Sequence, residues 1–283
     1  MTLLGTASAT LVVALVAGAL IGLSLGALGG GGSILAVPVL VYALDQSPAQ
    51  ATTGSLVVVG VTSLVGAVTA HRAGNVLLAR GVAFGLVATG GAVIGARASA
   101  AVPEAVLLGA FAVLMLAVGT LLAVRQWRGR RADPAERPAR RPELDDPIIT
   151  FSPTFACQCP RALKVVVTAT AVGLLTGFLG VGGGFLVVPA LLVALSLPME
   201  YAAGTSLVVI TLTSGVALLA RAGSGVAPDW WPVVALTAAA AVSAVVGARV
   251  ADRVDTRRLS AAFTGLVLAV AAYTAVQALP ALV

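Results

Sequence analysis

A glycine-rich unit that ends in proline occurs twice in this chain, inside a sequence that is otherwise almost continuously apolar. The first copy covers residues 26–38 and the second covers residues 177–189. Aligned without a gap, residues 22–58 and 173–209 agree at about half of their positions, as expected for an internal duplication. Duplicated membrane units whose helices are broken by Gly and Pro at corresponding places are typical of secondary transporters with a site between the two halves.

The composition places the chain in the membrane class. Hydrophobic residues make up 59% of the chain and charged residues 10%, whereas soluble domains are about half apolar and about a quarter charged. A helix needs about 20 apolar residues to cross a bilayer. Roughly eight stretches meet this requirement and are expected to span: residues 10–28, 52–70, 81–94, 106–124, 165–179, 206–220, 233–246 and 259–279.

Two shorter apolar segments, residues 33–44 and 184–195, follow the glycine runs. Each is about 18 Å long as a helix and is too short to span alone. The sequence therefore predicts an all-α polytopic membrane protein with two inverted-topology repeats and with broken or re-entrant helices at the glycine motifs. The first apolar run is interpreted as a membrane helix and not as a signal peptide, because no basic segment precedes it.

Arg and Pro are concentrated in one hydrophilic interval, residues 125–161, which is interpreted as a cytoplasmic linker. It divides the chain into a first membrane repeat, residues 1–124, and a second, residues 162–283. Much of the net charge of +6 lies near this interval. We attribute it to a loop at an anionic cytoplasmic membrane surface and not to nucleic-acid binding.

Positively charged loops are retained in the cytoplasm. Residues 71–80 and 249–258 are therefore expected inside with the linker, and residues 45–52 and 280–283 outside. The less basic loop at residues 221–229 is also placed outside, which inverts the second repeat relative to the first. The expected location is the bacterial inner membrane.

Glycine backbone at the two breaks is the first candidate substrate site, with Gly31, Gly32 and Ser33 in one half and Gly183 and Gly184 in the other. Unpaired backbone groups at membrane depth are tolerated only where they line a cavity or meet protein. Short helices that begin there would present free N–H groups and the positive end of the dipole, which suit anions. The alternative is that the glycines only permit tight helix crossing.

Small hydroxyl residues after the short segments are the second part of this site. Gly54 and Ser55 correspond to the triplet Gly204, Thr205 and Ser206. Their hydroxyl groups can donate to an oxyanion, or they can simply cap the following helices.

A further pair of hydroxyl residues lies about two turns into each of these helices, with Thr62 and Ser63 matching Thr213 and Ser214. Two interpretations remain open for them, the lining of a polar path and packing or hydrogen bonding within the helix.

These motifs resemble the TauE/SafE family of sulfite and sulfonate exporters, also called the TSUP family. Residues 180–189 and the triplet at Gly204 fit its pattern well. In the first half Ser33 replaces the last glycine, and Thr53-Gly54-Ser55 replaces the triplet. The resemblance implies transport of sulfur-containing anions such as sulfite, sulfoacetate or related organosulfonates. We interpret this as alternating access at a central site lined by glycine and hydroxyl groups.

Acidic residues are missing from the middle of every apolar run. Carboxylates within the membrane are typical of proton relays and cation sites, so a cation carrier or pump is disfavoured. We expect no catalytic residue, metal or cofactor, and hence no enzyme activity. The expected partners are a small anionic substrate and the lipid bilayer. A coupling ion, proton or sodium, and the oligomeric state are left open.

Cys157 and Cys159 suggest an alternative function, a membrane redox or sulfur-relay component. Two cysteines are too few for a closed zinc site, and a cytosolic location argues against a structural disulfide. A passive anion channel is a third interpretation, which differs from a transporter in whether flux saturates and shows counterflow.

Overall fold

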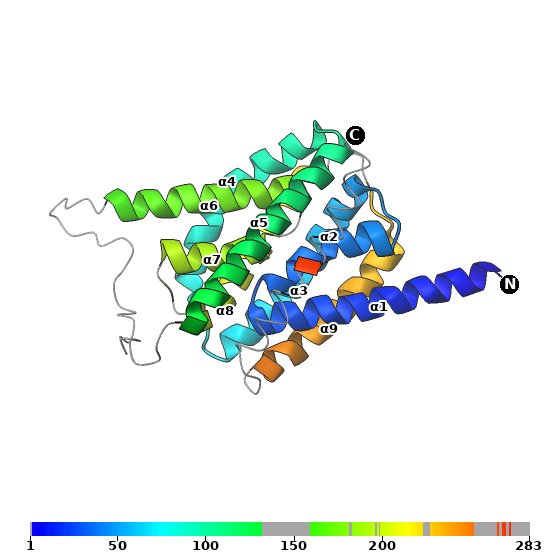
Figure 1. The fold of residues 1–283 in the computed structure, drawn as a ribbon, viewed down its shortest axis with the longest axis horizontal. Coiled ribbons are helices and arrows are strands. Elements are labelled where there is room, and N and C mark those ends of the chain that lie inside the picture. Colours follow the sequence, from blue (N-terminus) through cyan, green and yellow to red (C-terminus); the bar gives the residue numbers. More distant parts are fainter. Residues whose placement is uncertain are drawn as a thin grey trace.

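The protein is helical throughout the part of the chain that its computed structural model describes. That part comprises residues 2–131, 159–180, 183–195, 197, 199–222 and 227–251, with residues 265, 268, 269 and 272 near the C-terminus. No strand occurs within it. The elements in chain order (Figure 1) are α1 Thr2–Leu28, a 3₁₀ turn η1 Gly31–Leu35, α2 Ala36–Pro38, a π turn η2 Val39–Ala43, α3 Pro48–Arg72, α4 Leu78–Ala100, α5 Glu104–Arg131, α6 Cys159–Leu179, α7 Gly184–Ala194, α8 Met199–Arg221 and α9 Trp230–Ala251.

Among the described residues, five helices are long and apolar enough to cross a membrane, in α1, α3, α4, α8 and α9. Their outer surfaces carry large exposed apolar side chains such as Leu86, Leu219 and Trp231, as expected of helices that face lipid. The prediction of an all-α, multi-pass membrane protein is confirmed. The expected span at residues 259–279 lies largely outside the described residues, as does most of the expected linker, into which α5 continues as far as Arg131.

The first helix of the chain packs along the last described one, so the two halves exchange helices. Helices α1 and α9 lie side by side (Figure 1). Gly22 faces the backbone of Ala240, and Gly26 faces that of Ala244 one turn later. The residue numbers increase in the same direction along both helices, so α1 and α9 run parallel. Glycine is required at these positions because a side chain would meet backbone atoms of α9.

The same arrangement recurs where α4 packs on α6. Gly173 faces Ala88, and Gly177 faces Ala92. These four residues are the counterparts, in the repeat, of the four that join α1 to α9. The first half therefore contributes α1 to one parallel pair and α4 to the other, and the second half contributes the corresponding helices α6 and α9.

Both long helices are broken at the glycine motifs, as the sequence predicts. The chain turns at Gly29, which has a φ of 74°, and η1, α2 and η2 then fold back beside α1, with Gly32 packed on Ile21 and Leu25. In the second half the turn uses Gly180 and Gly183, with φ of 67° and 62°. Left-handed backbone of this kind is the conformation that glycine adopts without strain.

Helix α3 begins earlier than the sequence analysis placed it. Ser47 caps the helix, its hydroxyl accepting from the Gln50 backbone N–H while the Gln50 side chain accepts from the Ser47 N–H. Pro48 occupies the first helical position. A Ser-Pro-x-Gln sequence is a recognised helix start, so this boundary could have been read from the sequence.

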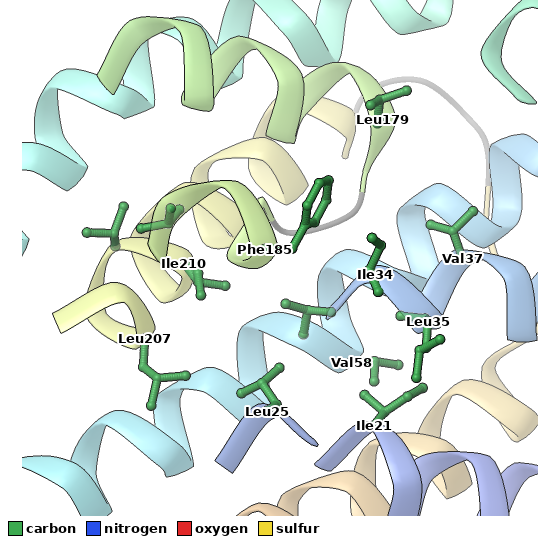
Figure 2. Close-up of a cluster of buried hydrophobic side chains, with 14 of the residues drawn as sticks. Ile21, Leu25, Ile34, Leu35, Val37, Val58, Leu179, Phe185, Leu207 and Ile210 are labelled. Carbon is green, nitrogen blue, oxygen red and sulfur yellow. The ribbon is translucent and has the colours of Figure 1, made fainter. Parts of the chain in front are cut away.

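Buried side chains from both halves form one large core, beside a smaller cluster of Leu56, Ala92, Ala96 and Ala217. Figure 2 shows Ile21 and Leu25 of α1 near Ile34 and Leu35 of η1, with Phe185 of α7 on the other side. The broken helices therefore lie in the interior, between α1 and α6 and the pair α3 and α8.

Candidate functional site

The two glycine breaks touch each other in the interior. A side-chain carbon on Gly184 would lie 2.8 Å from the Cα of Gly30 and 2.7 Å from Oγ of Ser33. The Ser33 hydroxyl donates to the Gly30 carbonyl over 2.8 Å. The breaks therefore meet backbone to backbone, at the boundary between the halves.

Each break also contacts the first turns of a long helix in the other half. A side-chain carbon on Gly29 would lie 2.6 Å from the Cα of Ala203 in α8, and one on Gly180 would lie 2.8 Å from the Cα of Thr52 in α3. Ser55 donates to the carbonyl of Gly180. Gly29 corresponds to Gly180, and Ala203 to Thr52, so the contacts are equivalent under exchange of the halves.

Side chains are excluded at most of the glycines predicted to approach substrate. A Cβ on Gly32 would lie 2.8 Å from the Leu25 nitrogen, and one on Gly183 would collide with the Thr176 hydroxyl. Gly31, which begins the 3₁₀ turn, is buried as well. Tight packing therefore accounts for much of the glycine pattern, and binding of an anion by these N–H groups stays a prediction.

The predicted hydroxyl residues lie inside α3 and α8 and make hydrogen bonds within the protein. Ser55 donates to the Thr52 carbonyl over 2.9 Å, and Ser206 to the Ala203 carbonyl over 2.7 Å. Thr205 accepts from the Leu77 backbone N–H over 3.1 Å. Since α3 begins at Pro48 and α8 at Met199, the interpretation of these residues as helix caps is wrong.

The structure gathers the predicted site residues into three places. Gly31, Gly32, Ser33, Gly183 and Gly184 meet in the centre. Gly54 and Ser55 lie in the first turns of α3, and Gly204, Thr205 and Ser206 lie in the first turns of α8. These two helices are antiparallel, because Gly60 faces Ser214 and Gly66 faces Leu207. Their first turns are therefore at opposite ends, on either side of the glycine breaks.

Arg221, at the end of α8, is a residue whose position the sequence analysis missed. Its Nη1 donates to Thr52 Oγ1 over 3.0 Å, and its Nη2 donates to Ser99 Oγ over 2.6 Å and to the Gly177 carbonyl over 3.0 Å. It thus joins α8 to α3, α4 and α6 beside the second glycine break. The corresponding position in the first half is Ala70, so the internal repeat gave no indication of this role.

In the described part of the chain, no group of three His, Cys, Asp or Glu side chains is placed to hold a metal ion. Cys157 lies outside the described residues, and Cys159 begins α6. The structure therefore does not test a redox function of this cysteine pair, which stays an alternative hypothesis from the sequence.

Comparison with known proteins identifies the family. The model of the family described as "Sulfite exporter TauE/SafE" matches residues 14–274, which include both glycine breaks. The chain belongs to the TauE/SafE family. Two proteins that are similar to this TauE/SafE member come from Xylella fastidiosa, one from strain Temecula1 / ATCC 700964 and one from strain 9a5c. Each is named "Probable membrane transporter protein".

Both relatives are 34% identical to the TauE/SafE member, over 202 and 206 residues respectively, and each alignment covers 71% of this chain and 70% of the relative. No solved structure matches it. Membership of this family, the names of the two relatives and the five apolar helices together identify the protein as a multi-pass membrane transporter.

Proposed function

We propose that this TauE/SafE member is a secondary transporter that moves small sulfur-containing anions across the bacterial inner membrane by alternating access. The substrates are sulfite, sulfoacetate or related organosulfonates. The observation that carries the proposal is the contact of Gly30 with Gly184, because it places two broken helices from related halves against each other in the interior. Broken helices at a repeat interface are where secondary transporters bind substrate.

The direction of the helices supports inverted repeats. The short segments after α1 fold back beside it. Helix α3 then runs in the same direction as α1, and α4 runs in the opposite direction, so α4 is antiparallel to α1. Helix α6 is parallel to α4, as the pairs Gly173 with Ala88 and Gly177 with Ala92 indicate. The first helix of the second half therefore runs opposite to that of the first half, which is the arrangement of an inverted repeat.

The packed breaks require movement for substrate to enter. Backbone N–H groups of Gly31, Gly32, Gly183 and Gly184 are shielded while Gly30 lies on Gly184. Rocking of the α1–α9 pair against the α4–α6 pair separates these residues and exposes the N–H groups and the Ser33 hydroxyl to one side of the membrane at a time. Helix starts and hydroxyl groups then stabilise the anion without a bound metal or cofactor.

Counterflow in proteoliposomes tests the function. Vesicles that contain the full-length protein and are loaded with unlabelled sulfite or sulfoacetate should accumulate the labelled anion transiently, and initial flux should saturate with concentration. Flux that rises linearly without counterflow would indicate a channel instead. A variant with both Cys157→Ser and Cys159→Ser should transport at the wild-type rate, whereas loss of transport would favour the sulfur relay.

A further inference from the structure

Three hydroxyl groups in the middle of α3 and α8 have no hydrogen-bond partner among the described residues. They belong to Thr62, Ser63 and Ser214, whose side chains are all 0% exposed. A buried hydroxyl without a partner destabilises the folded protein, so such groups are uncommon unless they serve a ligand or a function.

Other hydroxyl groups on the same two helices donate to a backbone carbonyl one turn earlier. Thr69 donates to Val65 over 2.9 Å on α3, and Thr211 donates to Leu207 over 2.8 Å on α8. This is the usual way in which a helix satisfies Ser and Thr in an apolar environment. The three unsatisfied hydroxyls depart from it although their helical backbone is the same.

These hydroxyls lie where α3 crosses α8, between the two halves. A side-chain carbon on Gly60 would be 3.3 Å from Cβ of Ser214, and Ser63 follows Gly60 by one turn on the same face of α3. Val61 and Leu64 are 41% and 51% exposed and mark the outer side of the helix, which points away from Thr62 and Ser63. Ser63 and Ser214 therefore lie at this crossing, and Thr62, about 100° around α3 from Ser63, lies on the inner side of the helix within one turn of them.

We propose that Thr62, Ser63 and Ser214 bind the oxygen atoms of a singly charged oxyanion, such as a sulfonate headgroup, midway along its path. The inference rests on the proposed transport function and narrows its substrates. Each hydroxyl can donate one hydrogen bond to an anion oxygen, and such bonds are stronger than those between neutral groups.

The surroundings favour a single charge on the ligand. Residues 49–70 of α3 and residues 201–220 of α8 contain no Lys, Arg, Asp or Glu. The basic residues at the ends of these helices, Arg72 and Arg221, lie about 10 Å or more from the hydroxyls along the helix axes. Removing an anion from water costs more as its charge rises, and neutral donors alone compensate a dianion poorly. The site should therefore select methanesulfonate over sulfate.

Titration calorimetry on the full-length protein in detergent tests this, with methanesulfonate and sulfate as probes. Wild-type protein should bind methanesulfonate at least about tenfold more tightly than sulfate. Thr62→Val, Ser63→Ala and Ser214→Ala should each raise the Kd for methanesulfonate about threefold to tenfold. Because each change removes an unsatisfied buried group, the melting temperature without ligand should stay the same or rise. Thr69→Val, which removes a satisfied hydroxyl on the same helix, should leave the Kd unchanged.

Two results would overturn the site. One is an unchanged Kd with a lower melting temperature in the three variants, which would make the hydroxyls structural. The other is equal affinity of the wild-type protein for sulfate and methanesulfonate. Counterflow separates this inference from the proposed function. If wild-type vesicles exchange sulfite and the three variants exchange it at the same rate, only the hydroxyl site is contradicted. If wild-type vesicles exchange no sulfur anion, the transport function is contradicted.

Discussion

The guanidinium of Arg221 donates to the hydroxyl of Ser99 over 2.6 Å and so joins the end of α8 to the end of α4. Further bonds to Thr52 and Gly177 connect the same side chain to α3 and α6. Hydrogen bonds to charged groups contribute about 1.5–3 kcal/mol each, and deleting the donor leaves buried acceptors unsatisfied. We expect Arg221→Ala to lower the free energy of unfolding by about 2–4 kcal/mol, measured as a fall in melting temperature in detergent.

Two controls accompany this change. Arg221→Lys should be intermediate, because an ammonium group donates from a single point and cannot reach the three helices as a planar guanidinium does. Arg97→Ala removes an exposed arginine near the end of α4 and should change stability by no more than about 0.5 kcal/mol. Equal melting temperatures for Arg221→Ala and Arg97→Ala would show that the bonds of Arg221 do not stabilise the bundle.

Gly30 is predicted to tolerate no side chain. A Cβ at this position would lie 2.7 Å from the Cα of Gly184, and its nearest neighbours are all backbone atoms of Gly184, so no flexible side chain can move aside. Gly30→Ala should therefore reduce stability by more than about 4 kcal/mol or abolish a monodisperse peak in size-exclusion chromatography.

The matched control is Gly90→Ala in α4, where an added Cβ would meet nothing within 4 Å. Replacing a helical glycine that has free space stabilises by about 0.5–1 kcal/mol. If both variants eluted and melted alike, the backbone contact between the breaks would not be required for folding.

The sequence predicted the features of this fold that repeat, because duplicated residues are visible without coordinates. The helix breaks at Gly29 and Gly180 follow from glycine and proline at matching positions. The exchange of α1 and α6 between the halves could not be predicted, since a repeat does not say whether a helix packs within its own half or on the other. The small residues at Gly22 and Gly173 indicated a close contact but not its partner.

The sequence indicated which residue types form the candidate site, but not how their side chains are arranged. The sequence analysis assigned Ser55 and Ser206 to one site with the glycine breaks; in the structure Ser55 contacts the Gly180 carbonyl, and Ser206 donates to Ala203 within α8. Whether a hydroxyl is already satisfied depends on the carbonyl that it meets, which is a three-dimensional property. For that reason the residues left without partners, Thr62, Ser63 and Ser214, could not be separated from their neighbours in the sequence.

The equivalence of the two helix pairs gives a prediction of its own. Cβ atoms on Gly22 and Gly173 would lie 2.8 Å and 3.0 Å from the Cα atoms of Ala240 and Ala88. Because the two contacts are nearly identical, Gly22→Ala and Gly173→Ala should lower the melting temperature by similar amounts, within about 1 kcal/mol of each other in free energy. Gly215→Ala, where an added Cβ meets nothing within 4 Å, serves as the control. A large loss in one variant alone would mean that the halves are not energetically equivalent.

The orientation of the bundle is the last prediction. The side chain of Gln50, near the start of α3, donates to the carbonyl of Ala227, while Ala73 caps the other end of α3. Because α3 is long enough to span, Ala73 and Ala227 must lie on opposite sides of the membrane. Basic loops remain in the cytoplasm, so Ala73, which follows His71 and Arg72, is expected inside and Ala227 outside.

Labelling with an impermeant maleimide in intact cells measures this directly, on a background with Cys157→Ser and Cys159→Ser. Both alanines are exposed, so Ala227→Cys should react in intact cells and Ala73→Cys only after the membrane is permeabilised. The opposite pattern would keep the fold and reverse its orientation, because the two positions would still be separated by α3. Reaction of both positions in intact cells would contradict the fold itself, since a helix that spans the bilayer cannot have both ends on one side.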